Sequence, residues 1–200
     1  MKPLIIVGLA AILVPRLATA DLFRSEPGLG IPDNVAVGIA DTLEASPSLT
    51  ITDLNIALEI EHTWIGDLIF TVTHGGVTVT IVDRPGVPSN TVGCHADLAC
   101  TREIVLDDEA EGAPPDSIEC GDISMCSTCF PGDLVPARSY FPNAALGAFD
   151  NIDQAGPWIL TASDNWPADT GRICAWEVRT NNTLAVEPAT WGGIKARYRD

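Results

Sequence analysis

The side chains that could do chemistry in this 200-residue chain are mainly carboxylates in segments that we expect to be loops. Calcium takes about six to eight oxygen ligands, which proteins supply from carboxylates and loop carbonyls. None of these acids follows the regular spacing of an EF-hand loop, so turn formation and capping of backbone N–H groups by aspartate is the alternative. Calcium is the only cofactor that we expect, and its candidate ligands are Asp107, Asp108, Glu109, Asp150 and Asp153.

Residues for bond-breaking chemistry are scarce. A serine protease needs a nucleophile, a base and an orienting acid, and the chain has three histidines but neither a Gly-x-Ser-x-Gly elbow nor a Gly-Thr-Ser-x-Ala segment. It also lacks the His-Glu-x-x-His pattern of zinc hydrolases. His62 ends an expected strand beside Trp64, where packing fits better than catalysis, His74 lies in a turn, and His95 could bind a metal only beside a free cysteine. We therefore expect no catalytic residues and no enzyme.

The first 20 residues resemble a secretory signal peptide. Lys2 gives a positive start, residues 4–14 are apolar, and Ala18-Thr19-Ala20 offers a small-residue cleavage site. The apolar run is too short for a membrane-spanning helix, and no later stretch is long enough. We expect a secreted or extracytoplasmic protein with no transmembrane segment in the mature chain; a buried N-terminal helix is the alternative.

The charge of the chain excludes some partners. The formal net charge is −16, and it becomes −18 when residues 1–20, with Lys2 and Arg16 and no acid, are removed. Nucleic acid and anionic membrane surfaces repel such a protein. We expect no nucleic-acid partner, and the acidity suits a soluble exported protein or one that binds divalent cations.

Six cysteines follow the export signal, so disulfides are the default expectation. The sequence alone does not choose among the roughly fifteen pairings. Cys126-Ser-Thr-Cys129 could instead hold zinc or act as a redox pair, but no second ligand pair lies at a matching spacing. The disulfide candidates are Cys94, Cys100, Cys120, Cys126, Cys129 and Cys174.

Alternation of apolar and polar residues predicts an all-β protein. Residues 50–62 alternate best, and residues 67–73, 77–83, 103–106, 157–163 and 173–178 continue the pattern. His74-Gly75-Gly76 between two of these segments signals a hairpin. No segment of ten or more residues after the signal has a helical period. Short strands with frequent Gly, Pro and Asp turns favour a β-sandwich.

The chain divides into four parts. Residues 1–20 are the signal, residues 21–30 an irregular lead-in, residues 31–180 the β-sandwich and residues 181–200 a C-terminal tail. Within the sandwich, the cysteine-rich segment would be a long loop braced by disulfides. The tail is either an ordinary flexible terminus or a basic sorting or docking segment.

Eight short motifs occur in an order that resembles one domain family over about residues 31–180. Each motif is weak alone, and the order carries the resemblance. The motifs are Ile31-Pro32-Asp33-Asn34, Asp41-Thr42-Leu43, Glu61-His62-Thr63-Trp64-Ile65-Gly66-Asp67-Leu68, Asp83-Arg84-Pro85-Gly86, Leu106-Asp107-Asp108-Glu109-Ala110, residues 142–150, Gly156-Pro157-Trp158-Ile159-Leu160, and Asp169-Thr170-Gly171 with Trp176. In this order they resemble the P domain, or homo B domain, of subtilisin-like proprotein convertases.

The resemblance implies a jelly-roll-like β-sandwich of about eight antiparallel strands. In convertases this module follows the catalytic domain, stabilises it and influences its calcium and pH dependence. The cysteine-rich loop is longer than the family pattern requires. The positions that carry the family motif are His62, Asp67, Trp158, Asp164, Asp169, Gly171 and Trp176.

Three functions remain open. The first is a secreted, non-catalytic P-domain protein that stabilises or contacts another protein, with a protease acting in trans as the candidate partner. The second is a relic or part of a convertase-like serine endopeptidase. The third is a carbohydrate- or surface-binding jelly roll, since the fold alone assigns no ligand. Trp64 and Trp166 lie beside turns and are the candidate sugar platforms, whereas Trp158 and Trp176 fit a buried face.

Overall fold

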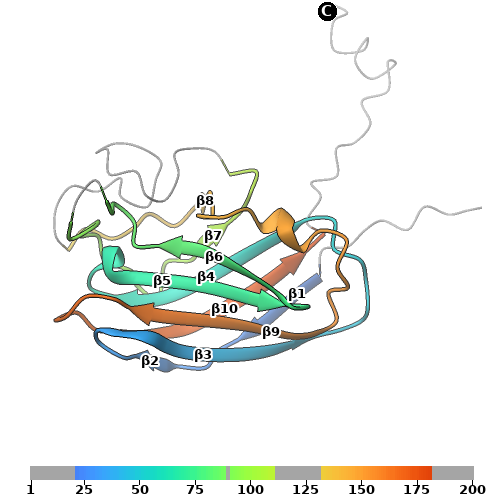
Figure 1. Ribbon diagram of the computed structural model, residues 1–200, viewed down its shortest axis with the longest axis horizontal. Helices are drawn as coiled ribbons and strands as arrows, with labels where there is room; N and C mark the ends of the chain where they lie inside the picture. The colour runs from blue at the N-terminus through green and yellow to red at the C-terminus, as the bar shows by residue number, and fades with distance from the viewer. Residues whose placement is uncertain (1–20, 89–90, 111–131, 182–200) are drawn as a thin grey trace, which may run out of the picture.

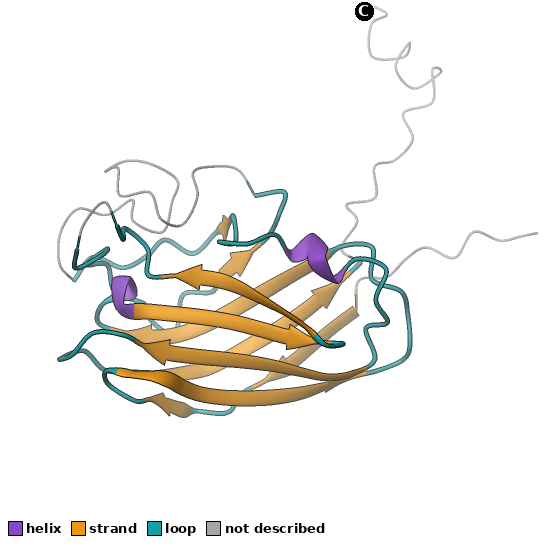
Figure 2. Ribbon diagram, in the orientation of Figure 1, coloured by secondary structure: helices purple, strands orange, loops and turns teal. Residues whose placement is uncertain are grey.

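The computed structural model describes residues 21–88, 91–110 and 132–181, which fold into two packed β-sheets (Figures 1 and 2). This confirms the expected all-β sandwich. The described part has ten strands and two short 3-10 helices, η1 (Ile65–Asp67) and η2 (Leu146–Phe149). Neither is long and apolar enough to cross a membrane. The expected signal peptide in residues 1–20, the expected tail from residue 182, and Cys120, Cys126 and Cys129 lie outside the described residues.

The first sheet is built around a long C-terminal strand, β10 (Gly171–Thr180). One edge of β10 pairs with β1 (Asp21–Ser25) and then with β2 (Leu29–Ile31), and the other pairs with β4 (Leu54–His62). Beyond β4 come β7 (Ile104–Leu106) and β8 (Ser139–Tyr140), which form the parallel pair of an otherwise antiparallel sheet. Strand β10 therefore carries hydrogen bonds along both edges.

The second sheet has the order β3 (Val35–Ala45), β9 (Gly156–Asp164), β5 (Leu68–His74) and β6 (Val77–Asp83). All its pairs are antiparallel. The turn between β5 and β6 consists of Gly75 and Gly76, with φ of 57° and 82°. A two-residue hairpin turn needs such positive φ values, so the expected hairpin is confirmed.

The connections between the sheets have jelly-roll order. If β1 and β2 count as one strand and the short β8 is set aside, eight strands remain. The first, eighth, third and sixth then form one sheet, and the second, seventh, fourth and fifth form the other. This arrangement is that of a double-sheet jelly roll.

The core lies between the sheets and contains the two tryptophans expected there. Trp158 on β9 and Trp176 on β10 are fully buried. Each indole N–H has a partner, since Trp158 donates to the Gln154 carbonyl at 2.9 Å and Trp176 donates to the Asp41 carboxylate at 2.7 Å. The alternating strands supply the rest, because their apolar positions are buried and their polar positions lie outward.

The segment expected to be an irregular lead-in contains two strands. Residues 21–25 and 29–31 pair with β10, so the sandwich begins at Asp21 rather than Ile31. These strands could not be predicted from the sequence, because they are short and one face is exposed; the Leu22 side chain, for example, is 57% exposed. Strand β3 was also not predicted, since its first half is largely exposed and shows no alternation. The described residues contain ten strands when β1 and β2 are counted separately and β8 is included. The pair of β7 and β8 is parallel.

One disulfide, Cys100–Cys174, joins the cysteine-rich region to β10 across 74 residues of sequence. The register between β10 and β4 shifts between Ile173 and Ala175, so Cys174 is the extra residue of a β-bulge. The bulge leaves Cys174 out of the ladder, where its sulfur meets Cys100. Cys94 is also disulfide-bonded, so disulfides are confirmed for the three candidates in the described residues.

The backbone of β10 lies close to Glu61 and His62 of β4 at Gly171. A Cβ at this position would lie 2.1 Å from the Glu61 carbonyl oxygen and 2.5 Å from His62 Cδ2. We expect Gly171→Ala to lower the free energy of unfolding by roughly 2 kcal/mol, because neither neighbour can move freely. Gly30→Ala on β2 is the matched control, since no heavy atom lies within 4 Å of its added Cβ. Urea titration should separate the two variants, and equal effects would contradict the close approach.

Candidate functional site

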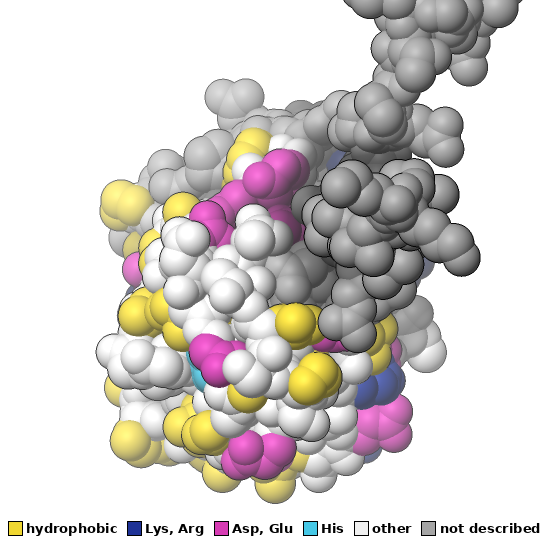
Figure 3. All heavy atoms as spheres, turned by 90° about the vertical axis from the view of Figure 1, so that its right-hand side faces the viewer, with side chains coloured by type: hydrophobic (Ala, Val, Ile, Leu, Met, Phe, Trp, Pro, Cys, Tyr) yellow, Lys and Arg dark blue, Asp and Glu magenta, His cyan; other side chains and the backbone are white. Residues whose placement is uncertain are grey.

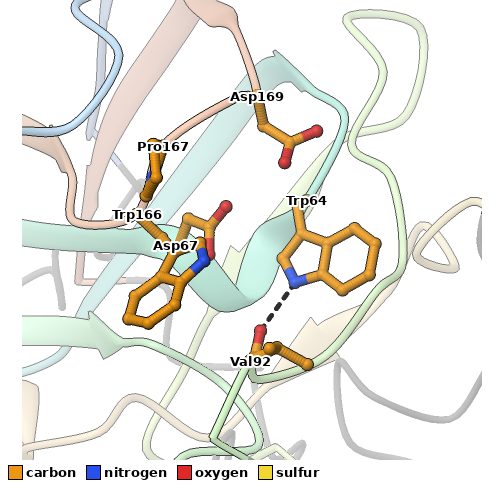
Figure 4. Close-up of a pocket in the computed structure, with 6 residues that line it drawn as sticks. All are labelled: Trp64, Asp67, Val92, Trp166, Pro167 and Asp169. Carbon is orange, nitrogen blue, oxygen red and sulfur yellow. Dashed lines mark hydrogen bonds between the residues drawn. The ribbon is translucent and has the colours of Figure 1, made fainter.

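A pocket opens at the end of the sandwich where η1 lies, and it contains two tryptophans and two aspartates (Figure 4). Its volume is about 210 Å³. One wall comes from the β4–η1 junction, and the other from the turn of residues 165–170 between β9 and β10. The residues that line this space, called here the Trp64–Trp166 pocket, are Trp64, Asp67, Val92, Trp166, Pro167 and Asp169.

A buried contact between His62 and Asp164 holds the two walls together. His62 Nε2 lies 3.3 Å from Asp164 Oδ2, and both side chains are fully buried. His62 Nδ1 lies 3.1 Å from the Trp64 backbone nitrogen and 3.0 Å from the Trp64 carbonyl oxygen. The other oxygen of Asp164 accepts the backbone N–H of Trp166 at 3.0 Å. The pair thus fixes the backbone next to both tryptophans.

Further hydrogen bonds tie the turn of residues 165–170 to β4 and η1. The Asn165 backbone N–H donates to the Asp67 carbonyl at 2.8 Å. The Thr63 hydroxyl donates to Asp169 Oδ1 at 2.7 Å. The other Asp169 oxygen is not used by this bond, so the residue can still accept a hydrogen bond at the pocket rim.

Asp67 is the unusual group of the pocket. Its side chain is 1% exposed, and neither carboxylate oxygen has a hydrogen-bond partner within the described part of the chain. Burial, followed by the charges of Asp164 and Asp169, raises the pKa of Asp67 to about 7. Buried polar groups in proteins are nearly always hydrogen-bonded, so an unpaired buried carboxylate in a pocket is a candidate functional group.

Both indoles line the pocket together with Asp67 (Figure 4). Trp64 is fixed by its Nε1–H, which donates to the Val92 carbonyl at 2.7 Å, and by an edge contact with His95. Trp166 is 45% exposed, and the Arg84 guanidinium lies 5.5 Å from its ring centre. Trp64 and Trp166 thus form one site, although the sequence had identified them only as separate exposed aromatics.

The structure brings five of the seven family-motif positions together at this end. Gly171 lies against His62, and Asp67 and Asp169 line the pocket next to the His62–Asp164 contact. The other two motif positions, Trp158 and Trp176, belong to the core. Val92 and Pro167 were not identified as pocket residues, because only the tertiary fold brings them to the same pocket as Asp67.

The other histidines have structural partners. His74 is buried, stacks on Trp158 with 4.0 Å between ring centres, and lies within hydrogen-bond distance of the Pro157 and Asp153 carbonyls. His95 cannot share a metal with Cys94 or Cys100, because both sulfurs are in disulfides. Neither contact of the His62 ring is to a hydroxyl or a thiol.

The candidate calcium ligands lie at the opposite end of the sandwich, around η2, where acidic side chains gather (Figure 3). Asp108 accepts the backbone N–H groups of Leu146 and Gly147 at 3.0 and 2.8 Å. Asp150 also lies near Gly147, since a Cβ there would be 3.6 Å from Asp150 Oδ2. The structure therefore brings Asp108 and Asp150 to one short helix, with Asp108 as its cap.

The remaining candidate ligands are also engaged within the protein. Asp107 accepts the Glu109 backbone N–H at 2.8 Å, and a side-chain hydrogen bond with Asp107 raises the pKa of Glu109. Asp153 lies apart from them and accepts the Ser48 hydroxyl at 2.6 Å, which lowers the pKa of Asp153. These contacts are the turn and capping roles named as the alternative to calcium.

Three candidate metal-ligand atoms within 4.8 Å of one another occur in the described residues only at Glu61, Cys100 and Cys174. The two sulfurs of this group are joined in a disulfide and are not thiolates. This group therefore does not fit a metal site.

No family model and no curated protein matches the chain. Among solved structures, it is similar to a serine protease of Aeromonas sobria in complex with its chaperone, with a TM-score of 0.46 and 12% identity. That match covers 82% of this chain and 27% of the protease chain. A second structure of the serine protease of Aeromonas sobria gives a TM-score of 0.45 and 12% identity, over 85% of this chain and 28% of the protease chain. At this level the likeness concerns overall shape.

Replacing the unpaired carboxylate should stabilise the protein in a pH-dependent way. Asp67 has a pKa of about 7 in the folded state and an ordinary value near 3.8. The folded state thus retains a proton that the unfolded chain releases, so Asp67 costs stability as the pH rises from about 4 to about 7. We expect Asp67→Asn to raise the free energy of unfolding by on the order of 2 kcal/mol at pH 8 and to have little effect at pH 4. Denaturant titration at both pH values tests this, with exposed Glu44→Gln as control; equal effects at the two pH values would refute it.

Thermal melting can test whether the acids at the η2 end bind calcium. Because Asp107, Asp108 and Asp153 already accept hydrogen bonds from the protein, we expect the melting temperature to be unchanged between millimolar calcium and excess chelator. A bound ion would instead stabilise the folded state by mass action. A shift of several degrees, lost in Asp108→Asn, would establish a calcium site there.

Proposed function

We propose that this chain is an exported, non-catalytic interaction module of the P-domain type, and that the Trp64–Trp166 pocket holds its protein partner. The observation that carries the proposal is the buried, unpaired Asp67 carboxylate in an open pocket between two indoles. Tryptophan is enriched where proteins bind one another, and buried unpaired charges concentrate at functional sites. A buried, unpaired carboxylate is unfavourable for folding, so a purely structural role does not account for Asp67.

A binding role fits the site better than a catalytic one. In a hydrolytic triad, the base contacts the nucleophile and is oriented by an acid. His62 has the orienting acid in Asp164, but its other ring nitrogen faces the Trp64 backbone rather than a nucleophile. The pocket therefore has a rigid buried frame and recognition groups at its surface, which is the arrangement expected for a binding site.

The partner that we propose is a protein of the exported fraction, with a protease acting in trans as the first candidate. This follows from the resemblance of the motifs around His62, Asp67 and Asp164 to those of convertase P domains. The resemblance of residues 1–20 to a secretory signal peptide supports binding to the partner outside the cytoplasm.

Carbohydrate binding is the second candidate, and the joint position of the two tryptophans favours it over the remaining alternatives. Indoles stack on sugar rings, and carboxylates accept hydrogen bonds from sugar hydroxyls. A volume of about 210 Å³ is small for a ligand of several sugar units. A sugar would have to bind largely on the exposed Trp166 face.

A photo-crosslinking experiment tests the proposed function. p-Benzoylphenylalanine replaces Trp166 in the mature chain, the protein is added to the culture medium of its source cells, and adducts are identified by mass spectrometry after irradiation. We expect one protein partner at position 166. The control is the same amino acid at Val37, which is 81% exposed on β3. Identical adducts at both positions, or none at 166, would refute a partner site at the pocket.

A further inference from the structure

We infer that the Trp64–Trp166 pocket takes an arginine side chain of the partner, with its guanidinium between the two indoles and hydrogen-bonded to the carboxylates of Asp67 and Asp169. This inference rests on the proposal that the pocket holds a protein partner, and it names the group that is recognised. It is carried by four features of the pocket: its charge, its unpaired acceptors, its aromatic walls and its size.

The charge around the pocket selects for a cation. Carboxylates approach it from η1, from the end of β9 and from the turn of residues 165–170. Among the described residues, Arg84 is the cation that acts on Asp67; its Nε–H donates to the Gly66 carbonyl at 3.1 Å, and its Nη2 has no hydrogen-bond partner there. Among the charges that act on Asp67, those of Asp164 and Asp169 outweigh that of Arg84. An anionic ligand group would be repelled here, and a cationic one attracted.

The unpaired oxygens of Asp67 define what the cation must offer. Both are buried and lack a hydrogen-bond partner among the described residues, so a ligand has to bring donors as well as charge. A guanidinium has five N–H donors in one plane and commonly binds carboxylates through two parallel hydrogen bonds. Asp169 at the rim, with one oxygen held by Thr63, can accept a further N–H.

The aromatic walls and the size favour arginine over lysine and over larger ligands. A guanidinium is planar, weakly hydrated and stacks on indoles, whereas an ammonium is compact and strongly hydrated. Arg84 already lies over one face of Trp166 at 5.5 Å, which shows that this ring accepts a guanidinium as a neighbour. The volume of about 210 Å³ is below the range of typical small-molecule pockets, as suits one side chain entering from a protein surface.

Arginine and citrulline peptides provide the test, because citrulline has nearly the same shape and no charge. The mature chain is titrated with acetyl-Gly-Arg-Gly-amide and its citrulline counterpart, and the indole N–H signals of Trp64 and Trp166 are followed by NMR. A single side chain should bind with a dissociation constant on the order of millimolar. We expect the arginine peptide to bind at least about tenfold more tightly than the citrulline peptide, and more weakly at high salt.

Two variants assign the effect to the pocket. Asp67→Asn keeps the shape and should abolish the preference for arginine over citrulline, while Glu44→Gln removes one distant negative charge and should preserve it. Equal affinity for the two peptides in the parent protein would overturn the inference. So would binding of sugars without binding of arginine, which would support the carbohydrate alternative.

The pH dependence gives a second readout. An arginine that requires the ionised form of Asp67 should bind more tightly as the pH rises from 6 to 8, since the pKa of this group is about 7. The dependence should vanish in Asp67→Asn. If it persists there, another group controls binding; the other titratable or charged side chains near the pocket are Asp33, His62, Arg84, His95, Asp97, Asp164 and Asp169.

The two proposals fail in different ways. An adduct at position 166 from a partner, together with equal arginine and citrulline affinities, would leave the interaction function standing and refute the arginine. Absence of both the adduct and the arginine preference would refute the two together.

Discussion

The contact between His62 and Asp164 is the constraint on which this end of the molecule depends. His62 ends β4 in one sheet and Asp164 ends β9 in the other, so their 3.3 Å contact joins the two sheets where both strands leave the core. Each partner also holds the backbone of a tryptophan, through Trp64 N–H on one side and Trp166 N–H on the other. Removal of either partner would leave a buried polar group unpaired at the junction of the two pocket walls.

Asp67 has the opposite character, because nothing within the described chain compensates its burial. The fold surrounds it with other carboxylates rather than with donors. Proteins commonly accept such a local loss of stability where a ligand group completes the arrangement. The His62–Asp164 pair is thus hydrogen-bonded within the protein, whereas the nearby Asp67 carboxylate has no hydrogen-bond partner among the described residues.

The strands with clear alternation could be read from the sequence, as β4, β5, β6 and β9 show, because burial of one face dictates their pattern. Strands β1, β2 and β3 could not, since long-range pairing with β10 or β9 rather than local pattern makes them strands.

The site was only partly predictable for the same reason. The motif positions His62 and Asp164 were identified, but their contact spans about 100 residues of sequence and depends on the packing of two sheets. For the acids around η2, adjacency in sequence suggested a shared ion, and the sequence did not reveal that Asp108 and Asp153 accept hydrogen bonds from the protein, because those donors come from distant residues.

The pairing of Asp21 with Thr180 brings the first and last residues of the sandwich side by side. A chain that enters and leaves a fold at one point can be spliced into a surface loop of another protein, or repeated in tandem, without stretching either junction. The pocket lies at the far end of β10 from this point. A protein fused at the junction would therefore be attached at the end of the sandwich opposite the Trp64–Trp166 pocket.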